Sequence, residues 1–190
     1  MNQNLPTVAV LAGGLSTRMN PLTEKVPKSM LEIKGRPFID YQLKWLKKSG
    51  ITNIVLCVSH LGQKILEYVK DGSSYDLQVN YAWDGKKLLG TGGAVKNALP
   101  LLGKTFYVLY GDSFLSIDFR EMYRTFQKSK KEAILSVYKN DDLWDKSNTV
   151  VENGNIIYHT KQKTDKRMKY IDYGASMLSV SVFDNHPNAF

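Results

Sequence analysis

Short apolar runs of strand length alternate with helix-like stretches over the first two thirds of the 190-residue chain. The apolar runs cover residues 7–11, 54–58, 78–83, 106–110 and 133–137, and the helix-like stretches cover residues 37–49, 63–70, 91–99 and 119–128. A chain that repeats strand, helix and strand is typical of right-handed crossovers between parallel strands. We therefore expect an α/β fold with a largely parallel sheet, in which the helix from residue 91 stops near Pro100.

The pattern changes after residue 139. An Asn-Gly pair at residues 153 and 154 separates two alternating runs, residues 149–152 and 155–159, which indicates a β-hairpin. Residues 176–182 form a further apolar segment. No linker separates these segments from the preceding ones, so we expect residues 1–190 to form a single domain in which a small antiparallel portion follows the α/β part.

Composition and charge exclude several classes of protein. No apolar run approaches the length of a membrane span, and the first residues lack the basic start and the apolar length of a secretory signal. The single cysteine, Cys57, excludes an internal disulfide framework and fits a reducing cytosol. The net charge of +8 is spread along the chain, and its one dense group, residues 161–169, lacks regularly interleaved aromatic side chains. We therefore expect a cytoplasmic protein with no membrane or nucleic-acid partner.

The first apolar run ends in a glycine turn that two cations follow. Glycines without Cβ atoms let backbone N–H groups approach an anion closely, and Gly13 and Gly14 stand at the carboxyl edge of the expected sheet, where ligands bind in such folds. Arg18 and Lys28 are donors that suit phosphate oxygens. The spacing matches neither a dinucleotide fingerprint nor a P-loop. A plain tight turn with surface cations is the alternative, and the combination favours a phosphate site.

A second glycine-rich stretch opens the helix expected from residue 91. Gly90, Gly92 and Gly93 would let a flat group lie against the backbone, and Thr91 adds a hydroxyl. The alternative is a helix start with a flexible lead-in. Three glycines in four residues favour a binding site for a planar group.

Asp112 follows the apolar run 106–110 directly after Gly111. A carboxylate at the carboxyl end of a strand is well placed for Mg²⁺, which prefers one or two carboxylates together with phosphate oxygens and water. In isolation, an Asp in a turn or at a helix cap would explain the same residues. The histidines lack metal-ligand spacing, and no serine has the partners of a hydrolase triad.

Four motifs together resemble the sugar-phosphate nucleotidyltransferase family, also called nucleotide-sugar pyrophosphorylases. Residues 11–30 resemble L-A-G-G-x-[GS]-T-R-[ML]-x-P-L-T-x-x-x-P-K-x-[ML], and the later stretches LGTGGA (residues 89–94), YGDSFL (110–115) and YIDYGASML (170–178) follow in family order. Within this family, the sequence is most similar to heptose-1-phosphate and mannose-1-phosphate guanylyltransferases. N-acetylmuramate-1-phosphate uridylyltransferases are also similar.

The resemblance implies a Rossmann-like three-layer α/β sandwich with a mostly parallel mixed sheet. It also implies a nucleotide-binding half at about residues 1–139 and a small antiparallel sugar-binding portion at about residues 140–190. The implied reaction is the Mg²⁺-dependent condensation of a nucleoside triphosphate (NTP) with a sugar 1-phosphate, which gives a nucleotide sugar and pyrophosphate. GTP with a heptose or mannose 1-phosphate is the expected substrate pair. A homo-oligomer is left open.

The resemblance also implies site residues, which group by the part of the substrates that they bind. The backbone at Leu11, Ala12, Gly13 and Gly14 would bind the base and the phosphates. Thr91 and Gly92 would also contact the base, and Asp84 would contact a guanine base. The implied catalytic residues are Arg18, which would bind the leaving pyrophosphate, Lys28, which would bind near the α-phosphate, and Asp112, which would ligate Mg²⁺. Lys161 would contact the sugar phosphate, and Asp172 and Gly174 would contact the sugar hydroxyls.

One departure from the family pattern leaves alternatives open. Family members generally run further and supply a second acidic metal ligand near their C-terminus, and no such motif precedes Phe190. A fragment, a short member or a non-catalytic nucleotide-sugar-binding homologue would each explain this. A uridylyltransferase acting on an amino-sugar 1-phosphate is a further alternative. A molybdopterin-type guanylyltransferase shares only the first motif, and the glycine spacing does not fit a nicotinamide oxidoreductase.

Overall fold

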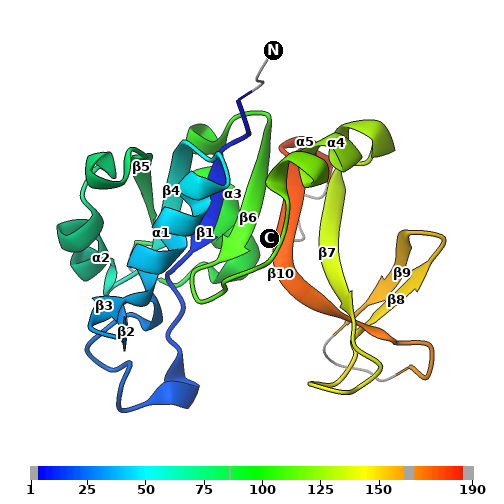
Figure 1. Ribbon diagram of the computed structural model, residues 1–190, viewed down its shortest axis with the longest axis horizontal. Coiled ribbons are helices and arrows are strands. Elements are labelled where there is room, and N and C mark those ends of the chain that lie inside the picture. Colours follow the sequence, from blue (N-terminus) through cyan, green and yellow to red (C-terminus); the bar gives the residue numbers. More distant parts are fainter. Residues whose placement is uncertain (1–3, 86, 161–164, 186–190) are drawn as a thin grey trace.

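The computed structural model describes residues 4–85, 87–160 and 165–185, and an eight-stranded sheet runs through it. Four strands form its parallel part in the order β5-β4-β1-β6 (Figure 1): β1 (Val8–Leu11), β4 (Asn53–Val58), β5 (Gln78–Trp83) and β6 (Thr105–Tyr110). β1 lies between β4 and β6, with Ala9 opposite Val55 on one side and Val108 on the other. The predicted parallel sheet is confirmed for these strands.

The antiparallel part begins at β10 (Tyr170–Ser179), which pairs with β6 on one edge and with β7 (Ala133–Lys139) on the other. Because both neighbours run antiparallel to β10, β6 and β7 run in the same direction. β10 also pairs with β8 (Thr149–Glu152), with Tyr170 opposite Thr149. β8 and β9 (Asn155–His159) form a hairpin that projects from the side of the molecule in Figure 1. The hairpin prediction is confirmed with its bounds.

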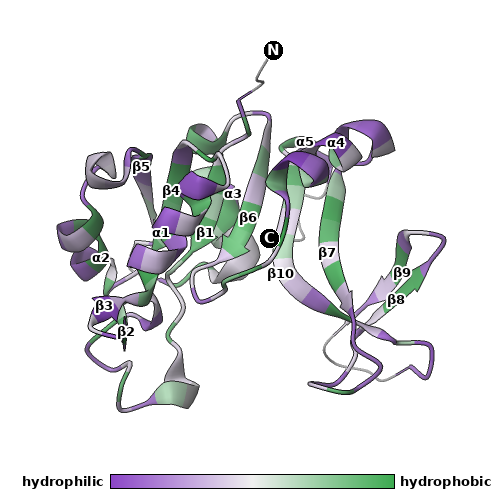
Figure 2. Ribbon diagram, in the orientation of Figure 1, coloured by the Kyte–Doolittle hydropathy of each residue, from purple (hydrophilic) through white to green (hydrophobic). Residues whose placement is uncertain are grey.

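Helices cover the two faces of the sheet and give three layers. One face packs against three helices, α1 (Phe38–Lys48), α2 (Gly62–Val69) and α4 (Phe119–Ser129). The other face packs against α3 (Gly90–Leu102) and the short α5 (Ser181–Asn185). Val8 and Val10 of β1 enter the first core and Ala9 enters the second, as side-chain alternation along a strand requires. Figure 2 shows hydrophobic residues along the central strands between the helices.

Short elements complete the fold. They are the 3₁₀ turns η1 (Thr17–Met19), η2 (Lys28–Met30) and η3 (Ser73–Tyr75), and the two-stranded ribbon of β2 (Glu32–Ile33) and β3 (Arg36–Pro37). The turns η1 and η2 and this ribbon lie between β1 and α1, so the first cationic motif forms one continuous excursion at the carboxyl end of β1.

Local structure differs from expectation in two places. α3 continues through Pro100 to Leu102, because Ala98 and Leu102 are buried one turn apart and their packing holds the last turn of the helix. The apolar segment 176–182 divides between the end of β10 and the start of α5. None of the helices in residues 4–85, 87–160 and 165–185 combines the length and the hydropathy of a membrane span.

Candidate active site

A cavity of about 290 Å³ opens at the carboxyl ends of β1, β4 and β6, beside the first turn of α3. We call it the first cavity. The predicted nucleotide-binding residues that line it are Leu11, Ala12, Gly13, Gly14, Asp84 and Thr91. Lys28 and Asp112 line it as well. The structure thus brings together residues from three of the four sequence motifs, and Asp84, at the sheet edge where an open α/β fold binds its ligands.

Three hydrogen bonds hold the backbone after β1 between its neighbours. Ala12 donates its N–H to the carbonyl of Cys57 over 2.9 Å, and the N–H of Gly111 donates to the carbonyl of Leu11 over 2.9 Å. The Ser59 hydroxyl donates to the carbonyl of Gly13 over 2.7 Å. The turn is therefore fixed in place before any ligand binds.

Gly111 and Gly14 differ in the room that they have. A Cβ atom at Gly111 would lie 2.8 Å from the carbonyl oxygen of Leu11 and 3.1 Å from the Cα of Ala12. A Cβ atom at Gly14 would meet nothing within 4 Å. The fold therefore needs a glycine at Gly111, whereas Gly14 leaves open space beside the backbone for a ligand.

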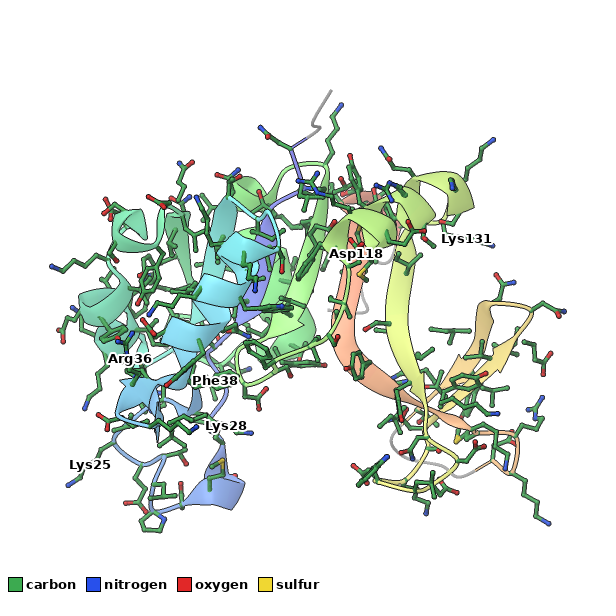
Figure 3. All side chains as sticks on the ribbon, viewed as in Figure 1. Lys25, Lys28, Arg36, Phe38, Asp118 and Lys131 are labelled. Atoms are coloured by element: carbon green, nitrogen blue, oxygen red, sulfur yellow. The ribbon has the colours of Figure 1, made fainter. Side chains whose placement is uncertain are left out.

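Lys28 and Asp112 form an ion pair within the first cavity. The Lys28 ammonium donates to Asp112 Oδ2 over 2.6 Å, and the two side chains are 37% and 38% exposed. Lys28 comes from η2 and lies below the strand ends, near β2 and β3 (Figure 3). A phosphate would compete with Asp112 for the ammonium, and a metal ion would compete with Lys28 for the carboxylate.

Asp84 is the second carboxylate of the first cavity, and its surroundings differ from those of Asp112. Burial raises the pKa of Asp84, and the hydrogen bond from the Leu89 N–H, 3.3 Å from Oδ2, partly opposes this increase in pKa. The thiol of Cys57 also lines the cavity, and burial, followed by the charge of Asp84, raises its pKa to about 12. Cys57 is therefore a neutral thiol at physiological pH and no nucleophile.

A second cavity of about 250 Å³ adjoins the first and shares Leu11, Thr91 and Tyr110 with it. Three predicted residues line it: Gly92, Asp172 and Gly174. Asp172 Oδ1 accepts the N–H of Gly174 over 2.8 Å, where β10 is irregular and Gly174 has a φ of +96°. Burial raises the pKa of Tyr110, and the charges of Asp172 and Asp112 add to this increase in pKa, so Tyr110 lies between the acidic groups of the two cavities.

Two predicted site residues, Arg18 and Lys161, lie partly or wholly outside the described residues. The backbone of Arg18 lies in η1, and its side chain falls outside the described part of the chain. Lys161 lies outside the described residues. The loop that carries Arg18 is tied by the hydroxyl of Thr23, a residue 3% exposed, which donates to the carbonyl of Ser16 over 2.9 Å.

The donor set of the first cavity fits a magnesium ion that a nucleotide brings with it. No group of three His, Cys, Asp or Glu side chains suited to a metal occurs in residues 4–85, 87–160 and 165–185. Mg²⁺ needs only one or two carboxylates when phosphate oxygens and water complete its shell. Asp112 supplies one partly exposed carboxylate beside the glycine turn, so the residues present satisfy that minimum.

Sequence reasoning missed two residues next to the site. Gln42 is fully buried on α1, and Ser29 of η2 is 3% exposed and lines the first cavity. Gln42 lies three residues after the buried Ile39 and four before the buried Leu46, so it lies on the apolar stripe of the helix. A polar side chain at an apolar position is the signal that could have identified it.

Comparison with known proteins identifies the family. The model of the family described as "Nucleotidyl transferase" matches residues 7–181. The D-glycero-alpha-D-manno-heptose 1-phosphate guanylyltransferase of Campylobacter jejuni is 32% identical over 177 residues, which cover 93% of this chain and 77% of that protein. The N-acetylmuramate alpha-1-phosphate uridylyltransferase of Neisseria meningitidis is 39% identical over 117 residues, which cover 61% of this chain and about half, 51%, of that protein.

Solved structures share the fold. HddC from Yersinia pseudotuberculosis, complexed with GMP-PN, superposes with a TM-score of 0.80 at 24% identity over 97% of this chain and 81% of that one. A UDP-glucose pyrophosphorylase complexed with UDP-glucose gives a TM-score of 0.74 at 18% identity over 97% and 80% of the two chains. The expected three-layer α/β fold and the family resemblance are confirmed, and the chain belongs to the nucleotidyl transferase family.

Proposed function

We propose that this nucleotidyltransferase condenses an NTP with a sugar 1-phosphate, and that GTP and a heptose or mannose 1-phosphate are its substrates. The observation that carries the proposal is the pair of adjoining cavities. The first holds a cation, a carboxylate and a glycine turn, and the second holds Asp172 and the irregular stretch of β10. A nucleotide in the first cavity would present its α-phosphate near Tyr110, which both cavities share.

The proposed reaction needs no nucleophile from the protein. An oxygen of the sugar phosphate attacks the α-phosphorus, a new P–O bond forms, the bond between the α-phosphorus and the bridging oxygen breaks, and pyrophosphate leaves with the bond electrons. Phosphoryl chemistry of this kind depends on positioning and charge neutralisation. Lys28 would supply positive charge next to the α-phosphate, and Arg18 would bind the leaving pyrophosphate.

Asp112 is the residue that would hold Mg²⁺. The ion, when bound, would neutralise phosphate charge and orient the triphosphate. Lys28 and Asp112 would each lose a partner if their ion pair opened, and Lys28 would then pair with phosphate while Asp112 would hold the metal. The exchange leaves no charge unpaired in the cavity, which keeps its electrostatic cost low.

Asp84 would select the base. A carboxylate can accept hydrogen bonds from N1–H and N2–H of guanine, and the backbone at Leu11 to Gly14, together with Thr91 and Gly92, would hold the base and phosphates. Uracil offers a single N–H, so an ionised Asp84 would favour guanine. The similarity to the uridylyltransferase of Neisseria meningitidis makes UTP the second candidate.

The sugar 1-phosphate would occupy the second cavity. Asp172 and Gly174 would contact sugar hydroxyls, and Lys161 would contact the phosphate. The sheet that joins both cavities supports the proposal that residues 1–190 act as one catalytic unit. We place the activity in the cytoplasm, since nucleoside triphosphates are available there.

Release of pyrophosphate tests the function. Purified protein is incubated with Mg²⁺, each of GTP, UTP, CTP and dTTP, and a panel of sugar 1-phosphates. We expect release that requires both substrates, with GTP and a heptose or mannose 1-phosphate giving the fastest rate. Nucleotide binding without pyrophosphate release for any pair would identify a non-catalytic homologue and refute the proposal.

A further inference from the structure

Gln42 connects helix α1 to the turn that carries Asp112. Its side chain is fully buried, and Nε2 donates to the carbonyl of Tyr110 over 2.9 Å and to the carbonyl of Ser113 over 2.8 Å. These two carbonyls enclose Gly111 and Asp112 in the sequence. One amide group therefore holds both ends of the turn that presents the carboxylate.

Only one of the two possible orientations of this amide fits its surroundings. A rotated amide would place Oε1 against two carbonyl oxygens, which repel it, whereas NH₂ has one hydrogen for each carbonyl. In the observed orientation, Oε1 of Gln42 is buried and has no hydrogen-bond partner among the described residues. A buried acceptor without a partner costs stability, and an apolar side chain of the same shape would avoid that cost.

The helix that carries Gln42 is firmly held. Ile39, Leu43 and Leu46 of α1 are each fully buried in the core between helix and sheet. The same helix packs against η2, which carries Lys28. Gln42 thus fixes the Asp112 turn to a rigid element, and that element also supports the other partner of the ion pair.

The other restraints on the turn act at its two ends. Ser113 donates its N–H to the carbonyl of Tyr110 over 3.2 Å, and Gly111 donates to Leu11. The Asp112 carboxylate itself is 38% exposed and is paired with Lys28. Loss of the two bonds from Gln42 would leave the carboxylate on a turn held at one end by β6 and at the other by the Ser113 bond, by the contact of Phe114 with Trp45 and by the burial of Leu115.

We propose that Gln42 is a positioning residue that fixes the Asp112 turn and thereby sets the affinity of the enzyme for its divalent cation. The proposal rests on the function proposed above, in which Asp112 binds the metal. It explains why a polar side chain occupies a buried position on the apolar stripe of α1. Gln42 itself touches neither substrate nor metal in this scheme.

The test compares the unsubstituted chain with Gln42→Met, which keeps the volume and removes both hydrogen bonds, and with Gln42→Glu, which has the same shape and replaces the donor Nε2 by an oxygen that faces both carbonyls. Leu46→Val is the matched control, because it weakens packing on the same helix without a hydrogen bond to the turn. The metal probe is Mn²⁺, followed by electron paramagnetic resonance in the presence of a non-hydrolysable GTP analogue.

We expect Gln42→Met to weaken Mn²⁺ binding by about tenfold or more, as for the loss of a supporting residue around a metal site. Gln42→Glu should weaken it further. Affinity for the nucleotide without metal should change by less than about twofold, since α1 holds no phosphate or base contact. Excess Mn²⁺ should restore kcat in Gln42→Met, whereas Leu46→Val should need no more metal than the wild type.

Hydrogen exchange gives a readout that is independent of the metal. The backbone amides of residues 110–114 should exchange faster in Gln42→Met, and their exchange rate should be unchanged in Leu46→Val. If a folded Gln42→Met, or Gln42→Glu where the first variant does not fold, keeps wild-type Mn²⁺ affinity and exchange, the positioning role is wrong.

Asp112→Asn separates this failure from a failure of the proposed function. If Asp112→Asn binds Mn²⁺ as tightly as the wild type does, Asp112 is not the metal ligand, and its proposed metal role and the positioning role of Gln42 fall together. If Asp112→Asn loses the metal while both Gln42 variants retain it, only the positioning role of Gln42 is refuted.

Discussion

Two aspartates in the first cavity differ in their environment, and the difference suits them to different tasks. Asp112 is partly exposed and paired with Lys28, so a metal ion could replace Lys28 as its partner. Burial raises the pKa of Asp84, which makes its negative charge costly until a ligand donates hydrogen bonds to it. The first carboxylate suits charge neutralisation, and the second suits recognition of N–H groups.

Asp84→Asn should raise the stability of the protein and weaken its selection of the base. The pKa of Asp84 is raised above 3.8 in the folded protein, so the folded state binds more protons than the unfolded state between that value and the raised pKa. Stability therefore falls as pH rises through this window, and removal of the charge should raise the melting temperature at pH 7 but not at pH 3. KM for GTP should rise, because one acceptor becomes a donor. Thermal unfolding at both pH values, together with steady-state kinetics, measures these effects, and an unchanged ratio of GTP to UTP turnover would contradict the role of Asp84.

Lys28→Met should impair the reaction much more than it impairs stability. A charge-assisted hydrogen bond to phosphate contributes about 1.5–3 kcal/mol, so kcat/KM for GTP should fall by about tenfold to a hundredfold. The melting temperature should change little, because partly exposed ion pairs contribute about 0–1 kcal/mol. Lys25→Met is the matched control, since Lys25 is exposed on the same excursion and points away from the molecule (Figure 3). Equal effects of the two substitutions on kcat/KM would exclude a specific role for Lys28.

At the scale of elements, the site depends on how closely the ends of β1 and β6 approach each other. Gly111→Ala would bring a Cβ atom to 2.8 Å from the Leu11 carbonyl oxygen and force these ends apart, whereas Gly14→Ala has open space around it. We expect Gly111→Ala to lower the free energy of unfolding by about 1–3 kcal/mol, as for other overpacked positions. Gly14→Ala should leave the free energy of unfolding unchanged and weaken only the binding of the nucleotide. Denaturant titration and calorimetric GTP binding distinguish the two, and a stable, active Gly111→Ala protein would refute the close approach.

The sequence predicted those elements whose signals are local. The run 78–83 and the hairpin of residues 149–159 have the expected bounds, because alternation and an Asn-Gly turn act over a few residues. The position of β10 between β6 and β7 was not predicted, since strand order depends on long-range pairing that no local pattern contains. Pro100 predicts that the helix stops near it, and α3 continues for two further residues to the buried Leu102.

The site was predictable where a motif carries it and unpredictable where packing creates it. Lys28 and Asp112 were each expected in the site, but their 2.6 Å contact joins residues 84 positions apart and appears only in the fold. Gln42 belongs to no motif, because its role depends on which turn α1 covers. The roles of the individual residues stay predictions until they are tested as described.

At the scale of the whole molecule, both cavities lie on one sheet edge and are lined by residues from distant parts of the chain. The first combines the ends of β1, β4 and β6 with η2 and α3, and the second adds β10. The net charge of +8 favours the approach of anionic substrates, and screening by salt weakens that attraction. A nucleotide in the first cavity would therefore contact segments that lie far apart in the sequence.

Ligand binding should raise the thermal stability of the whole chain in a base-dependent order. A ligand that binds only the folded state stabilises it by about 2.7 kcal/mol at a hundred times its Kd. For a protein of this size, that corresponds to an increase in melting temperature of about 5–11 °C. We expect this shift for GTP with Mg²⁺, a smaller one for UTP, and little further gain from Mg²⁺ in Asp112→Asn. Differential scanning fluorimetry at fixed ionic strength measures all three. A larger shift with UTP than with GTP would assign the enzyme to the uridylyltransferases, because the order of the shifts reports the fit of the base beside Asp84.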